Sequence, residues 1–193
     1  MTILEVIVMA VGLALDTMIV TIQKGAIHKN IKKEKLLEIG FIYGAVQTVV
    51  MGIGYFIMLV FTSFIDIGNF SRMRNYVLVS AVIFILCGIY LFYNTDRKRK
   101  TKEEDTGLYL MSVFVSAFKG SIDAFFLGIA SFVLYADILL VLISVFLITM
   151  VMAALGLLIG YYYGERYLKF TGVSGGVLMI LMGIYVIMKY RIL

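Results

Sequence analysis

Residues 108–163 form one apolar stretch that is too long to cross a membrane only once. As a single α-helix these 56 residues would extend about 84 Å, whereas the hydrocarbon core of a bilayer is about 30 Å thick. The chain must therefore fold back within the stretch, and the short polar interruption at Tyr135–Asp137 marks the turn. We expect two spanning helices here, over 108–133 and 138–163.

Four further apolar runs complete the pattern. Each is close to the roughly 20 residues that a spanning helix needs, and they cover 2–22, 37–62, 76–94 and 171–188. Hydrophobic residues make up 62% of the chain and charged residues 15%, and a soluble fold of this size cannot bury so much apolar surface. The composition excludes a soluble enzyme, a disordered chain and a disulfide scaffold. It indicates an all-α integral membrane protein with six spanning helices.

Basic residues are divided unequally between the two sides of the predicted membrane. Twelve Lys and Arg lie in the loops after the first, third and fifth runs, and four lie on the opposite side. The richer side is expected to be cytoplasmic, which places both termini outside and makes 95–107 a charged cytoplasmic linker. Membrane orientation also accounts for the net charge of +5, so we expect no nucleic-acid partner.

The two halves on either side of this linker share short motifs in the same order. The matched pairs are Leu15–Thr17 with Ile122–Ala124, Gly52–Tyr55 with Leu158–Tyr161, and Ile85–Tyr90 with Ile180–Tyr185. With three helices in each half, the halves must enter the membrane from opposite sides. We therefore predict two inverted three-helix repeats, residues 1–94 and 108–193, with a site near the midplane where they meet.

Two carboxylates lie in the middle of predicted spans, Asp16 in the first and Asp123 in the fourth. A charge at the bilayer centre costs about 2.5–3.5 kcal/mol on insertion scales, and its usual purpose is an ion or proton pathway. The alternative is a carboxylate that only bonds neighbouring helices together. If the repeats converge as predicted, both carboxylates face one cavity.

Two carboxylates surrounded by neutral oxygens suit a hard divalent cation such as Mg²⁺, Ca²⁺ or Mn²⁺. The chain has one histidine and one cysteine, which disfavours a zinc or copper site. The candidate neutral ligands are Thr17, Gln47, Thr48 and Ser121. The sequence thus predicts a transported cation and no resident cofactor.

Lys119 is an unusual charge inside the fourth run. It precedes Asp123 by four residues, so both side chains would lie on one face of a continuous helix. Three interpretations are open: a local ion pair, a tethered cation that competes with a metal for Asp123, or a lysine that extends its amine towards the membrane surface.

Glycines at intervals of four predict close contacts between helices. They are Gly40 and Gly44 in the second run and Gly156, Gly160 and Gly164 in the fifth. The adjacent pair Gly175 and Gly176 in the last run is expected to serve helix packing as well. Six helices can enclose a midplane site alone, although these glycine faces could equally form a homodimer in the lipid bilayer.

These residues resemble the MntP-type manganese efflux pumps, a family of six-helix proteins that is similar to the LysE-type exporters. The matching segments are Asp16 with Lys24–Gly25, Gly40–Gln47, Ser121–Ala124 with Gly128, and Gly175–Leu178. The resemblance implies export of Mn²⁺ across the plasma membrane of a prokaryote, with Asp16 and Asp123 at the transport site. The family's first-helix serine is Ala14 here, and Lys119 replaces a small residue.

Three functional hypotheses follow from the residues and the resemblance. The leading one is a secondary-active exporter that exchanges a divalent cation for protons or another ion, because no nucleotide-binding motif is present. The second keeps the fold but exports a zwitterionic or anionic small molecule, with Lys119 beside Asp123. The third is a non-transporting membrane protein, for example one linked to sporulation. We expect no enzymatic activity, since the sequence has no Ser–His pair.

Overall fold

The computed structural model describes residues 3–27, 33–64, 110–133 and 137–191, together with 82, 85, 86 and 89. The elements are the helices α1 (Ile3–Ile27), α2 (Lys33–Phe64), α4 (Leu110–Gly120), α5 (Ile122–Val133), α6 (Ile138–Tyr163) and α7 (Leu168–Arg191), and the short 3₁₀ helix η1 (Gly164–Tyr167). Among these residues the expected all-α class is confirmed. Most of the predicted third span and all of the charged linker 95–107 lie outside the described residues.

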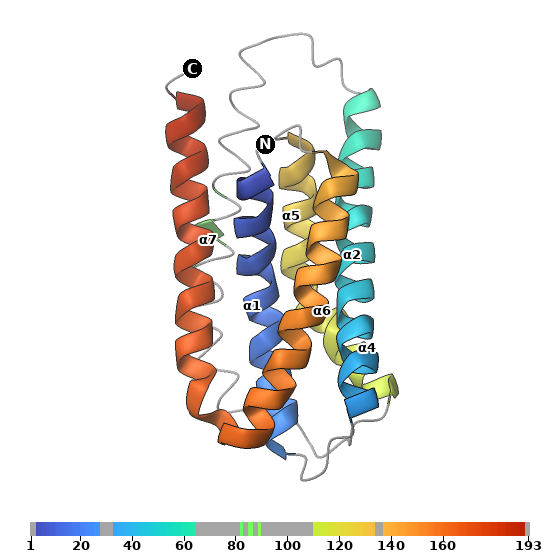
Figure 1. Ribbon diagram of the computed structural model, residues 1–193. Coiled ribbons are helices and arrows are strands. Elements are labelled where there is room, and N and C mark those ends of the chain that lie inside the picture. Colours follow the sequence, from blue (N-terminus) through green and yellow to red (C-terminus); the bar gives the residue numbers. More distant parts are fainter. Residues whose placement is uncertain are drawn as a thin grey trace.

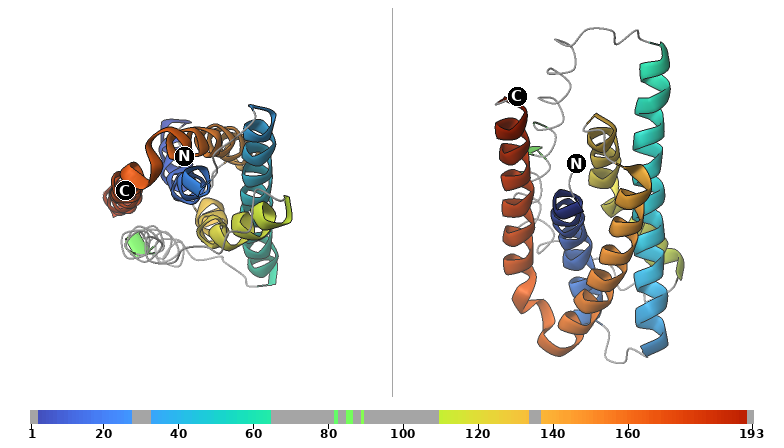
Figure 2. Two further views of the ribbon diagram at one scale, coloured as in Figure 1. Left: turned by 90° about the horizontal axis from the view of Figure 1, so that it is seen from below. Right: turned by 45° about the horizontal axis from the view of Figure 1, so that its top comes forward.

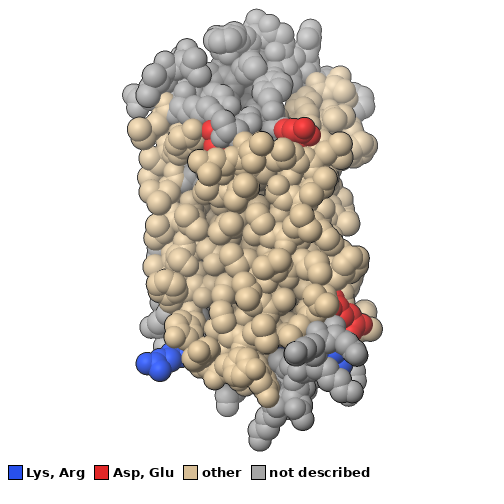
Figure 3. Space-filling view, in the orientation of Figure 1, with Lys and Arg blue, Asp and Glu red and all other residues tan. Residues whose placement is uncertain are grey.

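Several of these helices have the length and composition of membrane spans. α1, α6 and the stretch Lys35–Ser63 of α2 each qualify alone, and α4 and α5 together make a fourth, bent candidate. α7 contains a shorter apolar stretch, Val173–Tyr185. Figure 3 shows Lys and Arg only towards the lower end of this face and a broad uncharged surface above them. Such a surface suits contact with the apolar interior of a bilayer, and the protein is a multi-pass membrane protein.

α1 occupies the interior of the bundle. In it, 72% of the most apolar window is buried within the protein, against 28% for α2 and 22% for α6. Figures 1 and 2 show α1 between α7 and α6, with α2 on the opposite side of the bundle from α7. Polar side chains on α1 are therefore held among other helices rather than against lipid.

Corresponding helices of the two predicted halves run in opposite directions. α2 is antiparallel to α6, because Gly40 lies against Met150 and Gly44 against Phe146. α1 is likewise antiparallel to the α4–α5 pair. This direction is what an inverted repeat requires, while the repeat itself and the side on which the termini lie remain predictions. α1 begins and α7 ends at the same end of the bundle (Figure 1).

Close helix contacts are made through glycine. A Cβ atom at Gly40 would lie 2.7 Å from the Met150 carbonyl oxygen, and one at Gly156 would lie 2.9 Å from the Met18 carbonyl oxygen. A Cβ at Gly160 would overlap the backbone of Ile22. Because only glycine fits, α6 can approach both α1 and α2 at backbone distance. Gly175 and Gly176 are buried in α7.

Gly164 has a different role from the packing contact that its spacing predicted, and that prediction is wrong. No atom of the described residues lies within 4 Å of a Cβ built on it. Its φ of 61° and ψ of −147° place it in a region that is almost exclusive to glycine, and its N–H donates to the Gly160 carbonyl oxygen. Gly164 therefore ends α6 and allows the chain to turn into η1.

Replacing Gly164 with alanine should destabilise the protein without removing any helix contact. The strained backbone conformation leads us to expect a loss of about 1–3 kcal/mol in the free energy of unfolding. Thermal unfolding in detergent measures this loss. Gly120→Ala is the control, since a Cβ there also meets open space but the residue is helical. An equal melting temperature for the two variants would contradict the assignment.

The turn predicted at Tyr135–Asp137 falls between two helices, and its residues 135 and 136 lie outside the described ones. α5 ends at Val133 and α6 begins at Ile138. The Asp137 carboxylate caps α6 by accepting a hydrogen bond from the Leu139 N–H, with 3.2 Å between Oδ1 and N. A cap of this kind satisfies one of the N–H groups that have no partner inside the helix.

The predicted single helix over 108–133 is instead two helices that meet at Ser121, bent by 46°. The Ser121 N–H donates to the Phe118 carbonyl oxygen at 3.2 Å, and its hydroxyl donates to the Ala117 carbonyl oxygen at 2.7 Å. Glycine at 120 weakens the helix locally, and a serine that bonds back to its own helix often bends it. This break is the feature of the fourth span that apolar patterning did not predict.

Candidate functional site

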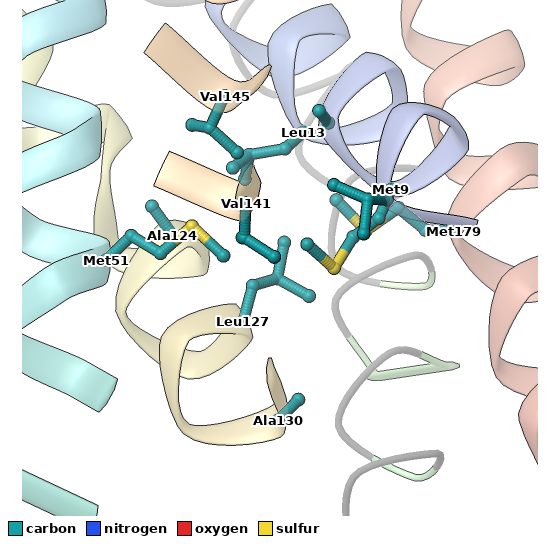
Figure 4. Packing of buried hydrophobic residues seen from close by; sticks show 11 residues of the cluster. Met9, Leu13, Met51, Ala124, Leu127, Ala130, Val141, Val145 and Met179 are labelled. Carbon is teal, nitrogen blue, oxygen red and sulfur yellow. The ribbon is translucent and has the colours of Figure 1, made fainter. Parts of the chain in front are cut away.

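Two large clusters at different levels make up most of the apolar core, and a third, small one contains Ile19 and Ile22. The first, shown in Figure 4, joins side chains from α1, α2, α5, α6 and α7 that point towards one another. Its labelled members are Met9, Leu13, Met51, Ala124, Leu127, Ala130, Val141, Val145 and Met179. The second cluster comprises Val20, Leu36, Ile39, Tyr43, Val46, Val113, Ala117, Ala153 and Leu157. Four spans contribute to both.

Polar side chains occupy the gap between the two clusters on every one of these four spans. We call them the polar layer: Asp16 and Thr17 on α1, Gln47 and Thr48 on α2, Lys119, Ser121 and Asp123 at the α4–α5 break, and Thr149 on α6. All the transport residues predicted from the sequence fall in it. Thr149 is an addition, since one threonine in an apolar run gave no signal beyond its polarity.

Most of the polar layer is shielded from solvent. Asp16 is 5% exposed, and Thr17, Gln47, Ser121 and Thr149 are buried as well. Asp123 is partly buried and Lys119 is exposed. A low-dielectric environment strengthens the interaction of a carboxylate with a cation and raises the cost of leaving a polar group unsatisfied.

A buried hydrogen bond connects α1 to α2 within this layer. The Thr17 hydroxyl donates to Oε1 of Gln47 at 3.0 Å, and Nε2 of Gln47 donates to the Leu13 carbonyl oxygen at 3.5 Å. These contacts fix the Gln47 amide beside the Asp16 turn. The Thr17 oxygen keeps its lone pairs for a cation or a water molecule.

The break in the α4–α5 span lies at the depth of Asp16. α1 contacts this span on both sides of the break, through Met9 Sδ and Ser131 Oγ at 3.8 Å and through Lys24 Nζ and Ser112 Oγ at 3.5 Å. Asp16 is midway between the two α1 contacts, and the break is midway between the two on the other span. The carboxylates of Asp16 and Asp123 are therefore both at the middle level.

α1 also packs against α7. The recorded contacts join Tyr185 with Glu5 and Met179 with Gly12. They show that the two helices are antiparallel, so one further turn brings Asp16 level with the buried Gly175.

Asp123 and Lys119 do not share one face of a continuous helix, because the break separates them. Asp123 belongs to the first turn of α5, where Oδ1 accepts a hydrogen bond from the Ala124 N–H at 2.8 Å. Lys119 is in the last turn of α4, with an exposed side chain. One of the three interpretations of Lys119 was an ion pair with Asp123 at i, i+4 spacing. That spacing brings side chains together only within one continuous helix, which the break rules out here.

The charged ligands available to a cation are few. Among the described residues, no group of three or more His, Cys, Asp and Glu is placed to hold a metal ion. A cation in the polar layer would then have at most the two carboxylates, with neutral oxygens or water completing its shell. A set of ligands with so little negative charge favours reversible binding of a cation over permanent binding.

Comparison with known proteins decides the family. The family described as "Putative manganese efflux pump", Mntp, matches residues 30–187. The chain belongs to this family. Its curated relatives include the "Putative manganese efflux pump MntP" of Methanosphaera stadtmanae, 28% identical over 97% of this chain and 99% of its own. The proteins of that name from Campylobacter fetus and Clostridium perfringens are 27% and 25% identical, each over 98% of this chain. No solved structure matches.

The resemblance seen in the sequence is thus confirmed at full length. Residues 30–187 include the α2, α4–α5 and α6 parts of the polar layer. Asp16 precedes this range, but the whole-chain similarity to MntP relatives includes α1. Membership of the manganese efflux pump family agrees with the apolar helices of the structure.

Proposed function

We propose that this chain is a secondary-active exporter of a divalent cation in the plasma membrane of a prokaryote, and that its main substrate is Mn²⁺. The observation that supports the proposal is the polar layer: each of four spans has polar side chains between the same two apolar clusters, and the Asp16 carboxylate among them is buried. Membership of the family described as "Putative manganese efflux pump" supports the choice of substrate.

In this proposal Asp16 and Asp123 supply the negative charge that binds the cation. Thr17, Gln47, Thr48 and Ser121 supply neutral oxygens, a donor set that suits Mn²⁺ better than a thiophilic metal. Lys119 modulates the site, because its exposed ammonium at the break opposes the approach of a second cation. The carboxylates can take up protons when the cation leaves, which would couple export to proton entry.

Alternating access requires an element that can move at the level of the site. The α4–α5 break is such an element, since the helix ladder is already interrupted at Ser121, beside the proposed site. The antiparallel directions of α1 and α4–α5, and of α2 and α6, support rocking of residues 1–94 against 108–193. The site would then open to one side of the membrane at a time.

Transport by the purified protein in proteoliposomes tests the proposal. Uptake of Mn²⁺, Fe²⁺, Co²⁺, Cd²⁺ and Ca²⁺ is followed with a metal-sensitive dye, and internal pH with a second dye. We expect Mn²⁺ flux accompanied by proton movement in the opposite direction. Liposomes without protein are the blank.

Lys119→Ala is the informative variant in this assay. If the lysine modulates a cation site, its removal should raise the apparent affinity for Mn²⁺ by severalfold. Absence of cation flux from the wild type would refute the proposed function. Flux that appears only in Lys119→Ala would show that the ammonium occupies the place of a cation, and would favour a zwitterionic or anionic substrate.

A further inference from the structure

Many Ser and Thr hydroxyl groups in the described helices donate back to a carbonyl of their own helix. Seven described side chains do so: Thr21, Thr62, Ser63, Ser121, Ser131, Thr171 and Ser174. Thr48 and Thr149 are different, because each has a buried hydroxyl oxygen with no hydrogen-bond partner among the residues that the structure describes. Thr149 is 0% exposed.

Both exceptions lie in the polar layer, on two helices that pack against each other. Thr48 follows Gln47 on α2. Thr149 precedes Met150, whose backbone meets Gly40, so the two threonines are about two helical turns apart along α2. Back-bonded hydroxyls occur above, below and within this layer. Among the described Ser and Thr side chains, the two with an unsatisfied buried hydroxyl both lie in it, one on α2 and one on α6.

A buried hydroxyl without a hydrogen bond is unfavourable, and an apolar group of the same shape would be neutral or stabilising in its place. Valine would therefore suit position 149 better if the site were only a packing position. The hydroxyl is explained if something small and polar binds it during the transport cycle. Water is the smallest such group, and a site needs two to four polar partners to hold it.

The small number of charged ligands in the layer also indicates that water binds there. Mn²⁺ prefers six oxygen ligands, but among the described residues at most two carboxylates are close to one level of the bundle. Small hard cations commonly retain several of their waters in protein sites. Those waters need acceptors and donors of their own.

We propose that Thr149, together with Thr48, binds water molecules of the hydrated cation and thereby sets the affinity for its partly hydrated form. This inference rests on the proposed function and deepens it, by assigning α6 a place in the site. Thr149 contacts the ion through water, so it is a positioning residue and not a direct charged ligand.

The test compares Thr149→Val with Thr149→Ser, which keeps the hydroxyl. We expect the KM for Mn²⁺ uptake to rise about tenfold in the valine variant, the equivalent of losing one net hydrogen bond, with a much smaller change in the serine variant. The control is Thr171→Val in α7, a buried threonine whose hydroxyl is satisfied by the Tyr167 carbonyl oxygen. Its KM should remain within twofold of wild type.

Thermal unfolding without metal gives a second readout that does not depend on transport. Thr149→Val should unfold at the wild-type temperature or above it, whereas Thr171→Val should unfold below it. A KM for Thr149→Val within twofold of wild type would overturn the inference, as would destabilisation equal to that of Thr171→Val. A wild type that carries no Mn²⁺ would instead refute the proposed function, and is recognised before any variant is compared.

Discussion

Asp16→Asn should abolish Mn²⁺ transport while the protein stays folded. The carboxylate is buried at the centre of α1, and asparagine has nearly the same shape without the charge. Loss of an outer-shell group at a metal site typically costs 10- to 100-fold in affinity, so loss of a charged ligand should cost at least about a hundredfold. Initial rates of Mn²⁺ uptake in proteoliposomes, at a fixed amount of folded protein, measure the effect.

Asp137→Asn is the matched control for this substitution. Asp137 is exposed and caps α6, and asparagine is an equally good cap. Its transport rate should equal that of the wild type. If Asp16→Asn retains more than a tenth of the wild-type rate, the buried carboxylate is not a ligand of the cation, and its role is the interhelical bonding left open by the sequence.

Gly160→Ala should prevent α1 and α6 from packing correctly, because the added methyl group would meet backbone atoms. The added Cβ would overlap the backbone of Ile22 and lie 2.9 Å from the Ala26 nitrogen. Backbone atoms cannot rotate away as a side chain can, so we expect a loss of about 1–3 kcal/mol or more. The measurements are the yield of monodisperse protein and its unfolding temperature.

Gly52→Ala separates packing from helix propensity. Both substitutions replace a helical glycine with alanine, which by itself favours the helix by about 1 kcal/mol. At Gly52, however, the nearest atom to the new Cβ is a methyl of Leu142 at 4.0 Å. Gly52→Ala should therefore be neutral or stabilising, and equal unfolding temperatures in the two variants would show that the α1–α6 contact adjusts freely.

The local chemistry of this chain determined several features by itself. Long apolar runs can be satisfied only as helices, because a bilayer offers no partner for backbone N–H and C=O groups. The α5–α6 turn could also be predicted from the sequence, because a 56-residue apolar stretch must fold back. Its position follows from Asp137, the one charged residue near the middle of the stretch. The carboxylates were recognisable because charge is expensive inside a membrane.

Other features depended on how the helices meet. An apolar helix face looks the same in sequence whether it touches lipid or protein, so the central place of α1 could not be derived from hydropathy. Ser121 is an ordinary helix residue by composition, and the 46° bend that it marks arises from its hydrogen bonds to Ala117 and Phe118. Gly164 matched a packing motif in spacing, but the end of α6 leaves it without a neighbour.

The polar layer shows most clearly which features the sequence determined and which the packing of the helices determined. The sequence identified Asp16, Asp123 and their oxygen-bearing neighbours, because each is a polar residue in an apolar run. Only the tertiary structure showed that they lie between the same two apolar clusters, and that Thr149 of α6 belongs with them. The physical reason is that the cost of a buried polar group depends on what surrounds it, and its surroundings come from other helices.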